Sequence, residues 1–239
     1  MRLITWNCQG AFRKKYGQIA RTSPDLAVIQ ECERPDLLNF REGLPAPTAC
    51  VWTGVNRWRG LGVFSFTGLE LEVDPGYDEG TRYFLPVRVG GRARFNLIAA
   101  WARDEGDPLR DYVGVLYRAV ERYTDFIREN ETVLAGDLNS NKHSGQPPRI
   151  GNYSDVVTRL AWERMTSAYH SFYRERHGEE RRKTLYLHRD RFKGYHIDYC
   201  FIPKGWLRLV KSVSVGRYEE WIRDSDHMPL EVEIQDLAS

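Results

Sequence analysis

Residues 132–139 read Thr-Val-Leu-Ala-Gly-Asp-Leu-Asn, and this stretch carries the signal that decides the fold. A short apolar run of this kind predicts a buried strand. Gly136 permits a tight exit from that strand, and Asp137 and Asn139 follow at its end. Asp137 can orient or deprotonate a water, and Asn139 can donate a hydrogen bond to a phosphate oxygen. An ordinary Asx turn after a strand explains the same residues equally well.

Polar side chains flank other apolar runs in the same way. Asn7 and Glu31 each end an apolar run near the start of the chain, and Asp226-His227 precedes one near its end. A carboxylate at Glu31 is costly beside an apolar strand unless it is paired or bound to metal. A set of oxygen ligands favours Mg²⁺ or Mn²⁺. Asn7 is open to a second interpretation as a polar strand cap.

Asp198 lies within the apolar stretch 196–202 and admits two interpretations. Its carboxylate can have a structural role and accept a hydrogen bond from a neighbouring backbone N–H. It can also orient His227 and stabilise its charged form, as a carboxylate does in a catalytic triad. An isolated Asp-His pair is more often part of a surface loop. The polar clusters at Asn7, at Glu31, at Asp137 with Asn139 and at Asp226-His227 nevertheless together predict a metal-dependent hydrolase that cuts a phosphoester.

The remaining pattern predicts a layered α/β fold with one domain over residues 1–239. Strands are expected at 3–6, 26–29, 63–66, 83–85, 95–98, 132–135, 196–202, 207–215 and 228–234. Helices are expected at 13–22, 108–128 and 155–165. Residues 169–195 show little periodicity and are expected to form loops with at most one short strand.

Composition excludes several classes of protein. Hydrophobic residues make up 41% of the 239 residues, and the net charge of +2 shows that the chain is not globally basic. None of the four cysteines forms a C-x-x-C pair, which argues against a zinc ribbon and fits a reducing compartment. No apolar run approaches the ~18 residues of a membrane helix. The first apolar run ends at Asn7 and reads as a core strand rather than a signal peptide, so we expect a cytoplasmic protein without a membrane partner.

The ordered clusters resemble those of the endonuclease/exonuclease/phosphatase superfamily, whose members include exonuclease III, apurinic/apyrimidinic endonucleases and deoxyribonuclease I. The resemblance spans nearly the whole chain through five motifs: Trp6-Asn7, Gln30-Glu31, Gly136-Asp137-Leu138-Asn139, Ile197-Asp198-Tyr199 and Ser225-Asp226-His227. Each motif is weak alone, but five in the family's order are specific. The resemblance implies a DNase I-like four-layer sandwich of two mixed β-sheets flanked by helices, with the site at one edge.

The resemblance also implies a role for each motif residue. Three side chains would lie at a Mg²⁺ or Mn²⁺ ion, with the first as its main ligand: Glu31, Asn7 and Asp226. Asp137 would position or activate the attacking water, Asn139 and His227 would hold the scissile phosphate, and Asp198 would orient His227. The metal would polarise the phosphoryl oxygen and offset charge on the leaving oxygen during in-line hydrolysis.

One position departs from the family pattern. Many members carry His or Tyr near the end of the central strand, where this chain has Trp101. Trp donates one N–H but cannot transfer a proton. Either Trp101 packs there and the role is lost, or another side chain such as His188 or Arg103 reaches the site.

Basic and aromatic residues suggest which phosphoester is cut. Residues 174–193 hold eight Lys or Arg against four acidic residues, which suits a nucleic-acid backbone or simply a solvated loop. Arg57-Trp58-Arg59 can form the tip of a groove-facing loop in which Arg57 and Arg59 bind the substrate, or simply an exposed hairpin. Tyr195 lies three positions before Asp198, where apurinic/apyrimidinic endonucleases carry an aromatic residue that lines the pocket for a base-free sugar. A core position explains Tyr195 slightly better.

Three hypotheses follow. The first is a monomeric Mg²⁺-dependent DNA nuclease of the exonuclease or repair type. The second is a phosphatase or phosphodiesterase acting on a small-molecule or lipid phosphoester. The third is a non-catalytic binding module, which is disfavoured because every candidate catalytic position is filled. Few insertions remain in a chain of this length to build a lipid pocket, which favours the nuclease.

Overall fold

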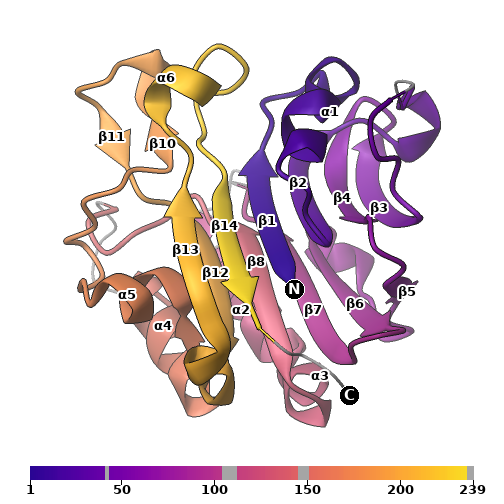
Figure 1. Ribbon diagram of the computed structural model, residues 1–239. Coiled ribbons are helices and arrows are strands. Elements are labelled where there is room, and N and C mark those ends of the chain that lie inside the picture. The colour runs from indigo at the N-terminus through magenta and orange to yellow at the C-terminus, as the bar shows by residue number, and fades with distance from the viewer. Residues whose placement is uncertain (41–42, 104–111, 145–150, 236–239) are drawn as a thin grey trace.

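Two six-stranded sheets form the centre of the molecule, and helices lie outside them (Figure 1). The computed structural model describes residues 1–40, 43–103, 112–144 and 151–235. The first sheet runs in the order β13 (Val210–Val215), β14 (Leu230–Ile234), β1 (Arg2–Asn7), β2 (Leu26–Cys32), β4 (Arg59–Ser65) and β3 (Ala49–Asn56). The second runs in the order β5 (Glu70–Val73), β6 (Phe84–Gly90), β7 (Phe95–Trp101), β8 (Thr132–Asp137), β12 (Asp198–Pro203) and β9 (Met165–Ser167).

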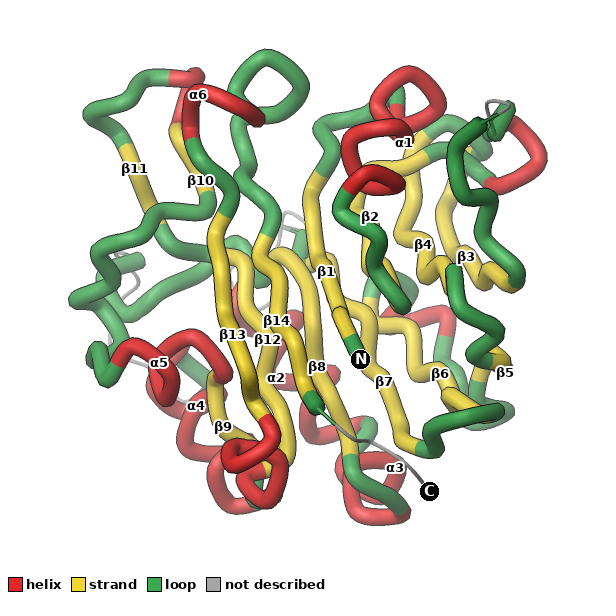
Figure 2. The backbone as a smooth tube through the Cα atoms, in the orientation of Figure 1, coloured by secondary structure: helices red, strands yellow, loops and turns green. Residues whose placement is uncertain are grey.

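The helices and a small hairpin complete the fold, with the strands central and the helices peripheral in Figure 2. The helices are α1 (Phe12–Arg21), α2 (Tyr112–Arg122), α3 (Thr124–Glu129), α4 (Tyr153–Trp162), α5 (Ala168–Tyr173) and α6 (Tyr218–Trp221). The hairpin pairs β10 (Leu185–Tyr186) with β11 (Gly194–Tyr195). No helix in the described ranges is long and apolar enough to cross a membrane.

Three apolar clusters hold the layers together. One fills the space between the two sheets, where Val28 and Val63 of the first sheet meet Leu97 and Val133 of the second. A second joins the outer face of the second sheet to α2, α3 and α4, and a third joins the outer face of the first sheet to α1 and Trp221. Strand residues on both faces are therefore buried, as expected for a four-layer sandwich. The predicted fold class is confirmed.

Both sheets are mixed, and their pairing brings the polar strand ends to one edge. β1 runs parallel to β2, and β7 runs parallel to β8. β12 runs antiparallel to β8 and opens with Asp198 opposite Asp137. β14 runs antiparallel to β1, so the segment that precedes it reaches the same edge as Asn7. The ends of parallel strands and the starts of their antiparallel neighbours thus meet.

Several predicted boundaries differ from the structure. The helix predicted at 108–128 is interrupted at Tyr123, which has φ −99° and ψ 19°, and its residues 108–111 lie outside the described residues. The helix predicted at 155–165 begins at Tyr153 after an Asn152 cap and ends at Trp162, because Met165 already pairs in the sheet. Residues 204–209 form 3₁₀ turns, so the strand predicted from 207 begins at Val210.

The prediction of loops with at most one short strand at 169–195 is wrong. This region contains most of α5 and both strands of the β10–β11 hairpin. The hydroxyl of Ser167 accepts from the backbone N–H of His170 and caps α5. A helix of six residues is too short to show an apolar period, and strands of two residues show no alternation.

Candidate active site at the strand ends

Glu31 reaches the sheet edge through a bulge in β2. Gln30 pairs with Leu61 and Cys32 pairs with Gly60, so Glu31 is the extra residue, and its φ is 62°. A bulge of this kind re-aims the side chain of the unpaired residue. The Glu31 carboxylate consequently turns to the strand end, where its Oε1 accepts from Asn7 Nδ2 at 3.4 Å and its Oε2 lies 2.7 Å from an Arg59 guanidinium nitrogen.

Asp137 is fully buried at the end of β8 and is held by hydrogen bonds. Its Oδ2 accepts from Asn7 Nδ2 and from Asn139 Nδ2, both at 2.9 Å, and its Oδ1 accepts from the backbone N–H of Asn139 at 2.9 Å. Gly136 has φ 153°, and a Cβ at that position would lie 1.8 Å from the backbone oxygen of Ala100. Only glycine therefore lets β8 approach β7 this closely next to Asp137.

His227 lies between two buried carboxylates. Its Nδ1 is 2.9 Å from Asp198 Oδ2, and its Nε2 is 3.9 Å from Asp137 Oδ2. The backbone N–H of His227 donates to Ser225 Oγ at 3.0 Å, and the Ser225 hydroxyl donates to the Asn7 carbonyl at 2.7 Å. The histidine is therefore fixed to the end of β1 as well as to Asp198.

The buried charges shift two pKa values. Burial alone would lower the pKa of His227, but the carboxylates of Asp198 and Asp137 outweigh burial and raise it to about 10. Burial raises the pKa of Asp137 to about 7, with the negative charge of Asp198 adding to burial and His227 opposing it. At neutral pH the imidazole is therefore a cation beside a carboxyl group that titrates near neutrality.

These side chains surround a cleft of about 370 Å³. Its lining residues are Asn7, Gln9, Glu31, Arg59, Trp101, Ala102, Arg103, Tyr112, Asn139, Asp226 and His227. Asp137 and Asp198 are fully buried and contact lining residues through the hydrogen bonds described above. A larger hollow of about 510 Å³ beside α4 is lined by other residues and does not include these strand-end side chains.

Most of the predicted site residues thus meet at one edge, but three substrate-contact candidates do not line the cleft. Arg57 lies in the β3–β4 turn, 3.6 Å from Asp36 and beside the Trp58 ring. His188 follows β10 and has φ 56°. Tyr195 is 44% exposed in β11, so the core position favoured for it is wrong. Gln9 and Tyr112 line the cleft and were missed, because neither carries a motif.

Trp101 packs at the end of β7, and Arg103 lies beside its ring. Trp101 is 2% exposed, pairs with Asp137 across β7 and β8, and packs edge-on against Tyr83. The Arg103 guanidinium lies 4.8 Å from the Trp101 ring centroid, and the Arg59 guanidinium lies 5.6 Å from it. Trp101 is therefore a buried residue whose ring contacts two arginines. Arg103 lines the cleft, whereas His188 does not.

The sequence model of the Endonuclease/Exonuclease/phosphatase family matches residues 4–227. The chain belongs to this family. The match covers all five motifs, so the resemblance of the sequence is confirmed. No curated protein matched the sequence.

Three solved structures similar to this member of the family are an exonuclease and two AP endonucleases of low sequence identity. A 3'-5' exonuclease (NExo) from Neisseria meningitidis is 20% identical with a TM-score of 0.68, covering 98% of this chain and 99% of that one. The AP endonuclease LMAP from Leishmania major is 14% identical with a TM-score of 0.69, covering 98% and 87%. An AP endonuclease from Archaeoglobus fulgidus is 14% identical with a TM-score of 0.68, covering 98% and 99%. These likenesses establish the fold.

The site offers a donor set that fits a divalent cation. Glu31, Asp226 and Asn7 all line the cleft, and the Glu31 carboxylate lies beside the Asn7 amide. Asp137 and Asp198 add two carboxylates at the same strand ends, whereas the protonated His227 beside them has no lone pair to offer an ion. Asp198 Oδ1 is buried and finds no hydrogen-bond partner among the described residues. Oxygen atoms dominate these groups, which is the preference of a hard ion.

Proposed function

We propose that this protein is a Mg²⁺- or Mn²⁺-dependent phosphodiester hydrolase that acts on DNA. The observation that carries the proposal is the position of His227 between the carboxylates of Asp198 and Asp137 at a cleft lined by Glu31. A fixed cation beside a carboxyl group that titrates near neutrality suits attack of water on a phosphoester.

The position of each residue in the site indicates its role. Glu31, with Asn7 and Asp226, would hold the metal ion, which when bound would supply charge stabilisation at the phosphoryl and leaving oxygens. Asp137 is placed to orient a water and take its proton, because its pKa of about 7 lies near the working pH.

The phosphate itself would contact donors in the cleft. The imidazolium of His227 would donate to its oxygens. The Asn139 amide, which donates to the Ala102 carbonyl and to Asp137 Oδ2, would exchange one of these bonds for a phosphate oxygen. Asp198 would act through His227, because it holds Nδ1 and sustains the positive charge. Arg59 and Arg103 both line the cleft. A guanidinium group stays protonated and does not act as an acid or base, so these two side chains would bind backbone phosphates.

DNA is favoured over a small phosphoester by the surroundings of the cleft. Trp58 is 56% exposed at the tip of the β3–β4 hairpin and lies beneath the guanidinium groups of Arg13 and Arg57. An exposed aromatic ring among cations is suited to nucleic acid, whose backbone and bases it can contact together. A monomeric state, a role in DNA repair and a cytoplasmic location stay predictions of the sequence.

A panel of substrates tests the proposal. End-labelled duplexes that are intact, carry one abasic site or end in a 3′-phosphate are incubated with Mg²⁺ or EDTA, beside a soluble aryl phosphodiester. Metal-dependent DNA cleavage supports the proposal, and the product ladder separates internal incision from trimming at the 3′ end. Turnover of the soluble ester alone, with no affinity for DNA, supports a small-molecule phosphoesterase instead. DNA binding without turnover of any substrate supports a binding module.

A further inference from the structure

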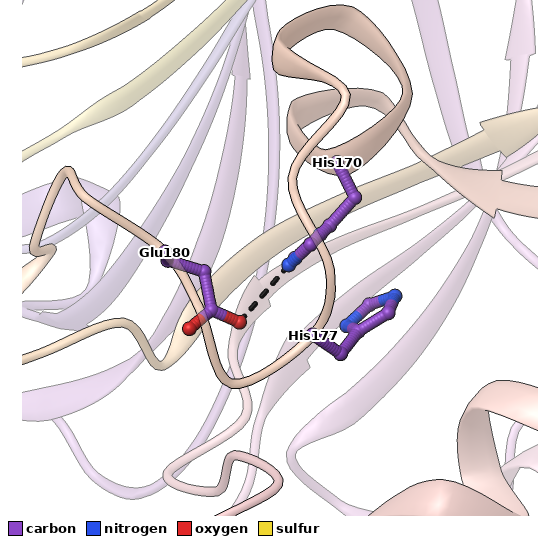
Figure 3. A group of neighbouring side chains, drawn as sticks. All are labelled: His170, His177 and Glu180. Atoms are coloured by element: carbon purple, nitrogen blue, oxygen red, sulfur yellow. Dashed lines mark hydrogen bonds and ion pairs between the residues drawn. The ribbon is translucent and has the colours of Figure 1, made fainter.

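A second cluster of metal-ligand side chains lies in the segment around α5. It consists of His170, His177 and Glu180, whose nearest nitrogen and oxygen atoms lie within 4.8 Å of one another. His170 Nε2 is 2.9 Å from Glu180 Oε1, and Figure 3 shows the two imidazole rings side by side next to that carboxylate. The ring centroids are 3.6 Å apart.

The far nitrogen of each ring is already occupied. His170 Nδ1 is 2.7 Å from Ser167 Oγ, and His177 Nδ1 is 2.9 Å from the Tyr153 hydroxyl. Histidines that bind a metal through Nε2 almost always bond the other ring nitrogen to a nearby polar group, which fixes the ring and its tautomer. Both histidines therefore have the supporting contacts of metal ligands, built from different elements.

The carboxylate is also preorganised. Glu180 is buried, and its Oε1 accepts from the backbone N–H of Gly178 at 2.8 Å as well as facing His170. Ligand atoms around a tetrahedral ion with bonds of about 2.0–2.1 Å lie about 3.3 Å apart. An ion that replaced the shared proton would need the His170 and Glu180 atoms to separate by only about 0.4 Å.

One adjustment is required of His177. The two stacked rings are inclined by only 20°, so their in-plane lone pairs lie in nearly parallel planes and cannot meet at one ion as they stand. His177 is partly exposed in a loop where Arg174 has φ 55° and Gly178 has φ 94°. His177 would therefore have to tilt away from the stacked ring to bring its Nε2 lone pair to the ion, whereas His170 is held in α5.

We propose that His170, His177 and Glu180 form a second metal site, separate from the cleft, that binds Zn²⁺ through two imidazole nitrogens and one carboxylate oxygen. This ligand set matches zinc, and a water would complete four-coordination. The bound ion would link the elements around the site rather than take part in the reaction of the cleft. It clamps residues 170–180, and the segment continues to Thr184, whose hydroxyl accepts from the backbone N–H of Asp198 at 3.0 Å.

Zinc stoichiometry and stability test the site without reference to nuclease activity. The full chain is stripped with EDTA and titrated with Zn²⁺ against a chromophoric chelator in excess Mg²⁺, and Co²⁺ spectra are recorded in parallel. His177→Asn keeps a group that can bond Tyr153 but removes Nε2, and Glu180→Gln removes the charge. His143→Gln is the matched control, because His143 contacts the same loop at the Gly178 carbonyl but is outside the cluster. Glu31→Gln reports any ion bound in the cleft.

We expect the wild type, His143→Gln and Glu31→Gln to bind one Zn²⁺ per chain outside the cleft and to melt at higher temperature with it. His177→Asn and Glu180→Gln should lose more than the roughly 10- to 100-fold in affinity that removal of a supporting contact costs. They should also lose the melting shift and the tetrahedral Co²⁺ spectrum while remaining folded by circular dichroism. The proposal is wrong if the wild type binds no zinc at micromolar concentration. It is also wrong if Glu31→Gln abolishes zinc binding and His177→Asn retains it.

Discussion

Replacing Asp198 with Asn tests how the charge on His227 is sustained. The two residues are 2.9 Å apart, with side chains that are 0% and 7% exposed. At an effective dielectric constant of about 20, unit charges at this separation attract by about 6 kcal/mol. That energy corresponds to about four pKa units. We therefore expect the pKa of His227 to fall from about 10 to about 6 in Asp198→Asn.

Catalysis should follow this titration. The wild-type imidazole stays protonated through neutral pH, so its activity should not be limited by His227 until the pH approaches about 10. The variant should lose activity as the pH rises through about 6. At pH 8, two units above that pKa, only about 1% of the variant's His227 is protonated, so the rate should be about 10²-fold lower than that of the wild type.

Two assays check the reasoning. Single-turnover cleavage rates of both proteins are measured from pH 5 to 9, and the His227 ring resonance is followed by NMR, with His227→Gln used to assign it. Urea unfolding establishes the folded fraction, so that a stability loss is not mistaken for a catalytic one. A variant that keeps the wild-type rate and pH profile, or a His227 resonance that titrates unchanged, would refute the reasoning.

Four further changes have expected outcomes. Gly136→Ala places a methyl against the Ala100 carbonyl, so urea unfolding should show about 3–5 kcal/mol lower stability. Glu31→Gln should raise the Mg²⁺ concentration for half-maximal cleavage at least about tenfold, measured after EDTA stripping. Arg103→Ala should weaken DNA binding and reduce the slope of log affinity against log salt by about one, whereas Lys211→Ala, at the opposite end of the first sheet, should not. Burial lowers the pKa of His196 to about 4, so the unfolded chain binds more protons between about pH 4 and 6.5. The contribution of His196 to stability should therefore fall by up to about 3 kcal/mol as the pH drops through this window. It is read as the difference between the wild type and His196→Asn in EDTA, because His177 and Asp137 titrate in both proteins.

The fold could be predicted because its signals are local and ordered. Buried strands such as Val133–Ala135 read as apolar runs, and each motif follows or precedes such a run. The pairing that brings Asp137 beside Asp198 was not readable from spacing, because they are 61 residues apart in sequence. The family resemblance supplied that juxtaposition.

The details that escaped prediction are set by tertiary contacts. Glu31 reaches the site through a bulge in β2. The bulge depends on how β2 pairs with β4 rather than on the sequence of β2 itself. Tyr112 lies in the cleft at the first residue of α2, where nothing in its neighbours distinguishes it from an ordinary helix residue. Arg103 matters because Trp101 provides a ring beneath it, a contact that no motif encodes.

Cleavage of end-labelled duplex DNA by the wild type and Asp137→Asn, with binding of both proteins to the same DNA measured in EDTA, tests the central claim most directly. Asn preserves the size of the side chain, and its one oxygen can still accept from Asn7 Nδ2 and Asn139 Nδ2, whereas its NH₂ group replaces the oxygen that accepts from the Asn139 backbone N–H. The amide cannot accept a proton from water. The account predicts equal DNA binding, cleavage by the wild type only with Mg²⁺, and a rate for the variant lower by about 10²- to 10⁴-fold. Cleavage that persists in EDTA, or that proceeds at the wild-type rate in Asp137→Asn, would contradict it.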